Sequence, residues 1–283
     1  MSDDVTGKVV VVTGATGGIG REIAFGLIRH GATVLIGARN AQRGAATRTA
    51  IVGEVDCAER VHVLPLDVAD LTSVRAFAAE IRVRFQTVHV LVNNAGAWFT
   101  ERRESRDGIE LTLATNVVGP HLLTDLLTAP LTNAKSGRVV NIVSSITGDY
   151  DADDLQFQVR PYDGFTAYKQ SKQALTMLTW GAADRLAPAQ ITANAVEPGF
   201  VRTDLNRNAH GLRAATINLF SRLIAVPPDK GADSPLWATL SADLNEVTGK
   251  LIAKRHVREG KYHDPTAIAD LEHRCTALDT PSA

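Results

Sequence analysis

The sequence predicts a single doubly wound α/β domain, built on a parallel sheet of about seven strands with helices on both faces. Short β-branched runs alternate with helical patterns, and most of these runs are apolar at successive positions rather than at alternate ones. Strands buried on both faces are typical of a parallel sheet. No repeat, low-complexity tract or linker interrupts the 283 residues, so we expect one domain over residues 1–283.

The expected elements follow one another in the order of repeated βαβ units. Strands are expected at 8–14, 33–39, 61–68, 88–96, 137–145, 191–199 and 249–253, and helices at 21–31, 73–85, 108–127 and 167–186. Gly31 gives the first helix a C-cap. Pro120 predicts a kink near Asn116, because proline lacks the backbone donor. Ligands of such sheets bind beyond the carboxyl ends of the strands, so the site is expected there.

Composition and charge exclude several classes of function. A formal net charge of −1 gives no general attraction to nucleic acid or to an anionic membrane. No apolar run approaches the roughly 20 residues that cross a bilayer, and the acidic N-terminus enters a strand without room for a signal peptide. Cys57 and Cys275 form no motif, and the eight histidines lack metal-ligand spacing. We expect a cytoplasmic protein with free thiols and no metal site.

A glycine-rich turn, "TGATGGIGRE", links the first expected strand to the first helix. Gly14, Gly18 and Gly20 let the backbone approach a pyrophosphate, which the free N–H groups of the helix N-terminus can bind. Glycines also serve tight turns for structural reasons alone. The position of this triplet between a strand and a helix favours a dinucleotide.

The end of the second strand indicates which dinucleotide is bound. An acidic residue about 20 positions after the glycines usually binds a free ribose 2′-hydroxyl, and this chain has Arg39 there. A guanidinium suits a 2′-phosphate, so NADP(H) is favoured over NAD(H). Arg21 is either a second contact or a solvated helix residue. The alternative for Arg39 is an ordinary surface arginine in a site that accepts both cofactors.

Two further strand ends carry polar groups that fit a cofactor cleft. The Asp67 carboxylate can accept a hydrogen bond from an adenine amino group, and "NNAG" at 93–96 supplies side-chain amides and a glycine. Asn, Asp and Gly are also ordinary turn residues, which is the alternative for both stretches.

The stretch "AYKQSK" places Tyr168 and Lys172 four positions apart, on one face of the expected helix. A tyrosine pKa of about 10 makes the phenol a poor proton donor or acceptor at neutral pH. A neighbouring ammonium lowers that pKa, so the pair suits proton transfer. The alternative is a solvated helix surface.

Taken together, these motifs resemble those of the short-chain dehydrogenases/reductases. "TGATGGIG", "NNAG", Asn116, Ser145, "YKQSK" and "EPGFVRT" occur in the order and spacing of that family, from about Lys8 to Gly249. "LATNVVGPHLLTDLL", "AYKQSK" and "PPDKGADSPLWATLS" are similar to the retinol-dehydrogenase-like branch. The resemblance implies a Rossmann-type sheet and hydride transfer between a nicotinamide and a carbonyl or alcohol.

The resemblance also implies a catalytic tetrad of Asn116, Ser145, Tyr168 and Lys172. Tyr168 would be the general acid or base, and Lys172 would lower its pKa and bind the nicotinamide ribose. Of the two serines in "VSS", the family pattern points to the second, which would hydrogen-bond the reacting oxygen. Asn116 would hold a water that relays protons through Lys172.

The predicted binding residues extend from the glycine turn to the segment after the sixth strand. The cofactor contacts expected are Gly14, Thr16, Gly18, Ile19, Gly20, Arg39, Asp67, Val68, Asn94, Ala95, Gly96, Tyr168, Lys172, Pro198, Gly199, Val201 and Thr203. The substrate contacts expected are Trp98, Phe99, Ile146, Tyr162, Phe165 and Phe200. The alternative for Pro198 and Gly199 is that they only shape a turn. The alternative for Trp98 and Phe99 is that their rings pack beneath the loop instead of lining the substrate pocket.

Three segments outside the core motifs have expected roles. The acidic insertion between Ser145 and Tyr168 is expected to be a solvated flap over the site rather than a calcium loop, because Asp154 and Arg160 replace the required glycine and glutamate. We expect residues 200–230 to be an apolar segment that caps the substrate cleft, and residues 255–283 to be a C-terminal tail.

The sequence therefore predicts an NADP(H)-dependent oxidoreductase acting on an apolar ketone, aldehyde or secondary alcohol. Two alternatives remain: a non-catalytic NADP(H)-binding sensor or scaffold, and an epimerase that retains its cofactor. Relatives commonly pair through the helices that carry Asn116 and Tyr168, which predicts a homodimer or homotetramer.

Overall fold

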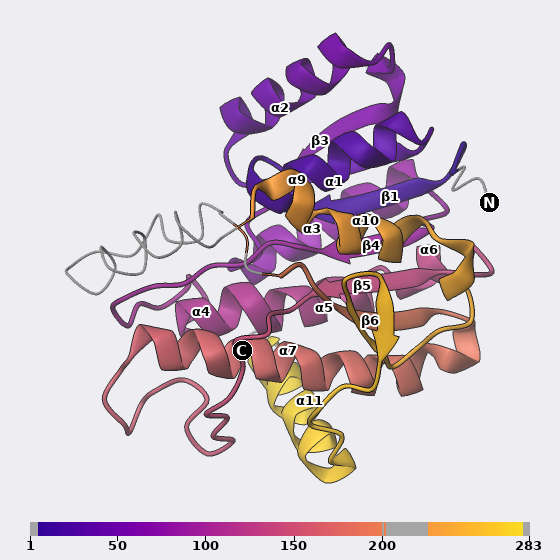
Figure 1. Cartoon of the computed structure of the whole chain (residues 1–283). Helices are drawn as coiled ribbons and strands as arrows, with labels where there is room; N and C mark the ends of the chain where they lie inside the picture. The colour runs from indigo at the N-terminus through magenta and orange to yellow at the C-terminus, as the bar shows by residue number, and fades with distance from the viewer. Residues whose placement is uncertain (1–4, 200, 202–225, 280–283) are drawn as a thin grey trace.

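The strands of the chain form one eight-stranded sheet in the order β3-β2-β1-β4-β5-β6-β7-β8, seen in a computed structural model that describes residues 5–199, 201 and 226–279 (Figure 1). The strands are β1 (Val9–Thr13), β2 (Thr33–Ala38), β3 (Val61–Pro65), β4 (Val90–Asn93), β5 (Arg138–Ile142), β6 (Thr192–Glu197), β7 (Leu251–Ala253) and β8 (His256–Arg258). The first seven strands are parallel, which confirms the prediction, and β8 adds an antiparallel edge.

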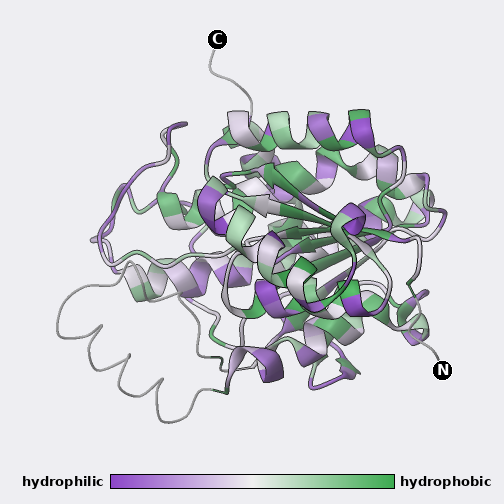
Figure 2. Cartoon of the chain, turned by 90° about the horizontal axis from the view of Figure 1, so that it is seen from above, coloured by the Kyte–Doolittle hydropathy of each residue, from purple (hydrophilic) through white to green (hydrophobic). Residues whose placement is uncertain are grey.

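Helices cover both faces of the sheet (Figure 1). One face carries α1 (Gly18–Arg29), α2 (Ala41–Glu54), α9 (Pro228–Gly231) and α10 (Asp233–Leu240). The other carries α3 (Leu71–Arg84), α4 (Leu111–Leu113), α5 (Gly119–Leu126), α6 (Thr128–Thr132), α7 (Gly164–Leu186) and α11 (Pro265–Asp279). In Figure 2 the apolar strands run between these two layers.

The alternation of side chains along each strand explains the uninterrupted apolar runs of the sequence. Val11 and Val139 point into the core under α3 and α7, whereas Val10, Val12 and Val140 point into the core under α1 and α10. Successive side chains of a strand face opposite sides of the sheet, so a strand with a core on both sides is apolar at every position.

The helix that carries Asn116 is irregular at the predicted place. Residues Ala114–Val118 form a π-helical turn, in which the N–H of Gly119 bonds to the carbonyl of Ala114 five residues back. Pro120 follows in the first turn of α5 and has no N–H to offer the carbonyl of Asn116. A Cβ on Gly119 would lie 2.0 Å from the carbonyl oxygen of Val68, so only glycine allows this close packing.

Two regions differ from the sequence prediction. The helix α2 was not expected, because it buries only Gly44, Thr47 and Ile51 and so has a weak amphipathic pattern. Residues 255–283 were expected to be a tail, yet they include β8 and α11. The helix α11 packs against α7 and buries its Leu271 and Cys275 in the core. Within the described ranges, none of the helices has the length and apolar character needed to span a bilayer.

Candidate active site

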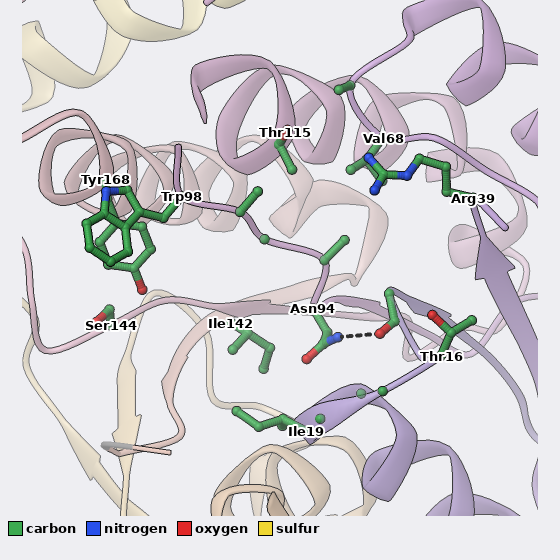
Figure 3. A pocket seen from close by; sticks show the side chains of 18 of the residues that line it. Thr16, Ile19, Arg39, Val68, Asn94, Trp98, Thr115, Ile142, Ser144 and Tyr168 are labelled. Carbon is green, nitrogen blue, oxygen red and sulfur yellow. Dashed lines mark hydrogen bonds between the residues drawn. The ribbon is translucent and has the colours of Figure 1, made fainter. Parts of the chain in front are cut away.

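A cleft of about 440 Å³ opens at the carboxyl ends of the strands, where ligands of this fold bind. Figure 3 shows it extending from Arg39 at one end to Tyr168 at the other. The predicted cofactor contacts that line it are Gly14, Thr16, Gly18, Ile19, Gly20, Arg39, Asp67, Val68, Asn94, Ala95, Gly96, Tyr168, Lys172, Pro198, Gly199 and Val201. Thr203 lies outside the described residues.

The glycine turn forms a close-packed junction between β1, α1 and the end of β4. Gly14 and Gly18 have φ angles of +68° and +52°, which glycine adopts without strain. A Cβ on Gly20 would lie 2.3 Å from the side-chain nitrogen of Asn94, and that nitrogen donates to the carbonyl of Thr13 at 2.8 Å. No side chain caps the N-terminus of α1, and its first turn holds no acidic residue. This end of the helix therefore fits a pyrophosphate.

Two arginines lie at the far end of the cleft. Arg39 is 3.9 Å from the Asp67 carboxylate in an ion pair that leaves 73% of the arginine side chain exposed. Such an exposed ion pair contributes little to the stability of the fold and leaves the guanidinium able to bind an anion. Arg43 also lines the cleft and donates to the carbonyl of Thr16 at 3.2 Å. The Arg21 guanidinium stacks 5.0 Å from the Phe25 ring and does not line the cleft.

Sequence reasoning missed Arg43 because it missed the helix that presents it. Arg43 lies in the first turn of α2, where its N–H donates to the Asn40 side chain that caps the helix. Asn40 was the available signal, because asparagine is a favoured N-cap residue and marks the start of a helix.

Tyr168 and Lys172 lie together on α7 and are both buried. The Nζ of Lys172 donates to the carbonyl of Ile142 at 2.9 Å and lies 5.9 Å from the centre of the Tyr168 ring. Burial lowers the pKa of Lys172 to about 8. Burial also raises the pKa of Tyr168, and the Ser144 hydroxyl opposes part of this rise. The direction of the shift is therefore opposite to the lowering expected beside Lys172.

The serine beside Tyr168 is Ser144 and not the predicted Ser145. The chain turns after β5, and Ser144 Oγ accepts from the N–H of Ile146 at 3.0 Å. This turn leaves Ser144 on the wall of the cleft, below the Tyr168 hydroxyl in Figure 3, and leaves Ser145 exposed to solvent. The prediction of the second serine was wrong because the direction of the backbone turn after β5, rather than the sequence motif, decides which hydroxyl faces the cleft.

Asn116 is fully buried behind the cleft wall. Its Oδ1 accepts from the N–H of Ala97 at 2.8 Å, and its Nδ2 donates to the Ala97 carbonyl and to Ser171 Oγ, both at 2.9 Å. Both amide hydrogens are thus used by the protein. The side chain therefore has no hydrogen left to donate to a water, whereas the backbone carbonyl of Asn116 receives no hydrogen bond from Pro120, which lacks an N–H.

Aromatic and aliphatic side chains line the end of the cleft beside Tyr168. Trp98, Phe99, Ile146 and Phe165 line it as predicted, and the rings of Trp98 and Phe165 meet edge to face at 6.3 Å. Tyr162 does not line the cleft: its hydroxyl bonds to Glu110 and to the backbone of Phe99, so the prediction that it contacts substrate is wrong. Phe200 and most of the expected capping segment lie outside the described residues.

The comparison with family models decides the class of the protein. The model described as short chain dehydrogenase matches residues 8–211. The chain belongs to the short-chain dehydrogenase/reductase family. Among curated relatives of this dehydrogenase, human retinol dehydrogenase 13 is 34% identical over 87% of the chain and 76% of that protein. Mouse polyprenol dehydrogenase is 35% identical over 93% of the chain and 79% of that protein. The chain thus lies in the retinol-dehydrogenase-like branch.

Solved structures of this family share the whole architecture. The dehydrogenase superposes on an uncharacterized protein from Mycobacterium paratuberculosis with a TM-score of 0.75 and 27% identity, covering 98% of the chain and 96% of that protein. Pseudomonas aeruginosa RhlG, solved with NADP, gives 0.69 at 25% identity, covering 93% of the chain and 98% of that protein. Family and structural neighbours together make this chain an NAD(P)-dependent oxidoreductase.

Proposed function

We propose that this dehydrogenase uses NADP(H) to interconvert an apolar ketone or aldehyde and the corresponding alcohol, with Tyr168 as the general acid and base. The observation that carries the proposal is the buried pair of Tyr168 and Lys172, with Ser144 beside it, at the apolar end of a cleft that begins at a glycine turn. A buried phenol with an ammonium one helical turn away is an arrangement suited to proton transfer.

The cleft residues fit the cofactor along its length. The N-terminus of α1 would bind the pyrophosphate, and Arg39 with Arg43 would bind a 2′-phosphate through charge-assisted hydrogen bonds. Asp67 and Val68 would contact the adenine, and Lys172 the nicotinamide ribose. The nicotinamide supplies the hydride when it is bound.

Tyr168 would move the proton that accompanies the hydride. In reduction the phenol donates its proton to the carbonyl oxygen, and in oxidation the phenolate removes the hydroxyl proton of the alcohol. Burial, which raises the pKa of Tyr168, keeps the phenol protonated at neutral pH and so suits reduction. The hydroxyl of Ser144 would donate to the same substrate oxygen. A water on the Asn116 carbonyl would return protons by way of Lys172.

The apolar wall supports an apolar substrate. Trp98, Phe99, Ile146 and Phe165 offer aromatic and aliphatic surface beside Tyr168. The curated relatives are named for retinol and polyprenol, both long apolar alcohols. A substrate that buries its apolar part against these side chains would gain roughly 25 cal/mol for each Å² removed from water.

A Tyr168→Phe variant tests the mechanism. Purified protein is incubated with NADPH and a panel of ketones and aldehydes, and the loss of nicotinamide absorbance is followed. We expect Tyr168→Phe to lower kcat by about 100-fold or more while the Kd for NADPH changes little. Tyr150→Phe, a change of a half-buried tyrosine away from the cleft, is the control and should retain activity. Normal turnover by Tyr168→Phe would rule out the mechanism.

We also propose a cytoplasmic homodimer or homotetramer, as the family resemblance suggests. In this chain α11 packs on α7 and touches α5. It therefore covers part of the surface that those two helices could offer to another copy. Light scattering of the purified protein measures the assembly, and a single chain mass at all concentrations would refute it.

A further inference from the structure

Tyr162 belongs to the insertion between β5 and α7, yet its side chain turns away from the cleft. The hydroxyl lies 3.2 Å from the carbonyl oxygen of Phe99, 3.1 Å from Oε1 of Glu110 and 3.3 Å from Oγ1 of Thr112. A phenol has one proton to donate, so the Phe99 carbonyl and the Glu110 carboxylate share it, while the Tyr162 oxygen can accept from Thr112. The hydroxyl therefore ties the insertion to the start of α4 and to the backbone of the substrate wall.

This tie is one of two that hold the backbone on either side of Trp98. On one side the Asn116 amide bonds to both backbone groups of Ala97, at 2.8 and 2.9 Å. On the other side the hydroxyl of Tyr162 bonds to the Phe99 carbonyl. Trp98 lies between these two points, with 7% of its surface exposed, and packs edge to face on Phe165. The position of its ring thus depends on both ties.

The insertion is held firmly enough to transmit this constraint. Gln156 accepts from Nε of Arg102 at 3.0 Å through its carbonyl and from the N–H of Glu110 at 3.2 Å through its side chain. On the opposite side, Gln170 of α7 is buried and donates to the Leu155 carbonyl at 2.9 Å. The insertion is thus bonded to both the Trp98 loop and the helix of Tyr168.

The packing around the Phe99 carbonyl leaves little space for it to move. A Cβ placed on Gly164 would lie 2.0 Å from that oxygen, so the first residue of α7 must be a glycine for the two segments to meet. Loss of the Tyr162 hydroxyl would leave a buried carbonyl short of its side-chain donor, which favours a shift of the loop.

We propose that Tyr162 is a positioning residue which, through the Phe99 carbonyl, fixes the Trp98 ring and thereby selects ring-bearing ketones and alcohols over small acyclic ones. The inference rests on the proposed function for its substrate and on the observed hydrogen bonds of Tyr162 for its geometry. An aromatic wall held in one position favours a flat ring, because offset and edge-to-face contacts need defined geometry. A small acyclic ketone covers less of the wall and depends less on its position.

Kinetics of Tyr162→Phe test the selectivity. With NADPH saturating, 1-tetralone and 2-butanone are compared as substrates. We expect the variant to raise KM for 1-tetralone about 5- to 10-fold, with kcat within about 2-fold and little change for 2-butanone, because the hydroxyl acts on binding rather than on proton transfer. Tyr150→Phe, which removes a buried hydroxyl without a hydrogen-bond partner in the described structure, is the matched control and should leave both substrates unchanged.

A second measurement needs no turnover. The chain has three tryptophans, so Trp180→Phe with Trp237→Phe leaves Trp98 as the sole indole. In that background Tyr162→Phe should increase acrylamide quenching of Trp98 about 2-fold, as a loosened loop admits the quencher, and Tyr150→Phe should not. Unchanged quenching together with wild-type selectivity overturns the role of Tyr162. If Tyr162→Phe increases quenching but the wild-type protein reduces no ketone, the role of Tyr162 in positioning Trp98 stands and the proposed function is refuted.

Discussion

Ser144 lies beside the Tyr168 hydroxyl on the wall of the cleft, whereas its neighbour Ser145 is exposed to solvent (Figure 3). The Ser144 hydroxyl lowers the pKa of the Tyr168 phenol, while burial raises that pKa by a larger amount. The two influences together set the pH at which the phenol can act as a base, so Ser144 affects catalysis through proton affinity as well as through any contact with substrate.

The serine pair gives a sharp test of this relationship. Ser144→Ala should lower kcat about 10- to 100-fold, because a donor to the reacting oxygen is lost. In alcohol oxidation the active form is the phenolate, so the rate rises with pH through the Tyr168 pKa. Loss of the Ser144 hydroxyl, which lowers this pKa, should move the rise to higher pH. Ser145→Ala should behave as wild type within about 2-fold. A larger effect of Ser145→Ala than of Ser144→Ala on the pH–rate profile would favour Ser145, the serine predicted from the sequence, as the catalytic one.

Lys172 should lower stability at neutral pH. Its pKa is lowered from 10.5 to about 8 by burial, which corresponds to about 3 kcal/mol of unfavourable free energy while the group is charged. Lys172→Met removes that cost and also the bond to the Ile142 carbonyl, worth about 1 kcal/mol. We expect the variant to be inactive yet more stable by roughly 1–2 kcal/mol at pH 7 in urea unfolding.

The pH dependence of this difference follows from the direction of the shift. Because the folded-state pKa is the lower one, the unfolded chain binds more protons between about pH 8 and 10.5, and wild-type stability gains from Lys172 as pH rises through that window. The advantage of Lys172→Met should therefore shrink between neutral pH and about pH 9.5. An advantage that stays constant would show that the cost of Lys172 is not one of burying charge.

The two arginines at the far end of the cleft should set cofactor choice. Arg39→Ala and Arg43→Ala should each raise KM for NADPH about 10-fold or more, since each removes a charge-assisted contact to the 2′-phosphate. KM for NADH, which lacks that phosphate, should change little. Arg21→Ala serves as the control, because its guanidinium stacks on Phe25 outside the cleft. An equal rise in KM for NADPH and NADH would show that the arginines contact a part of the nucleotide other than the 2′-phosphate.

Arg138 tests the other end of the sheet, where no catalytic role is expected. Its buried guanidinium donates to the carbonyls of Ala238, Thr239 and Ser241, and to the side chain of Asn245, over 2.6–3.2 Å. Arg138→Met leaves these acceptors unpaired at the end of α10 and should cost about 3 kcal/mol or more. Arg138→Lys should cost less. Both should retain kcat below their melting temperatures, and lost activity in the folded variants would point to a wider role.

Much of the site could be predicted because it depends on local patterns. A glycine turn between a strand and a helix, and a tyrosine and lysine four positions apart, imply their geometry through backbone constraints that span only a few residues. For the same reason Pro120 gave the place of the π-helical turn. The weakly amphipathic α2 offered no such signal, and Arg43 was missed with it.

The sequence by itself determined the parallel sheet, the cofactor end of the cleft and the Tyr168–Lys172 pair, because periodicity and short-range spacing encode them. Only the tertiary structure decided that Ser144 rather than Ser145 lies beside Tyr168, that burial raises the pKa of Tyr168, and that Tyr162 faces Glu110 instead of the cleft. Each of these depends on side chains that lie far apart along the chain or on a turn direction, which no local pattern specifies.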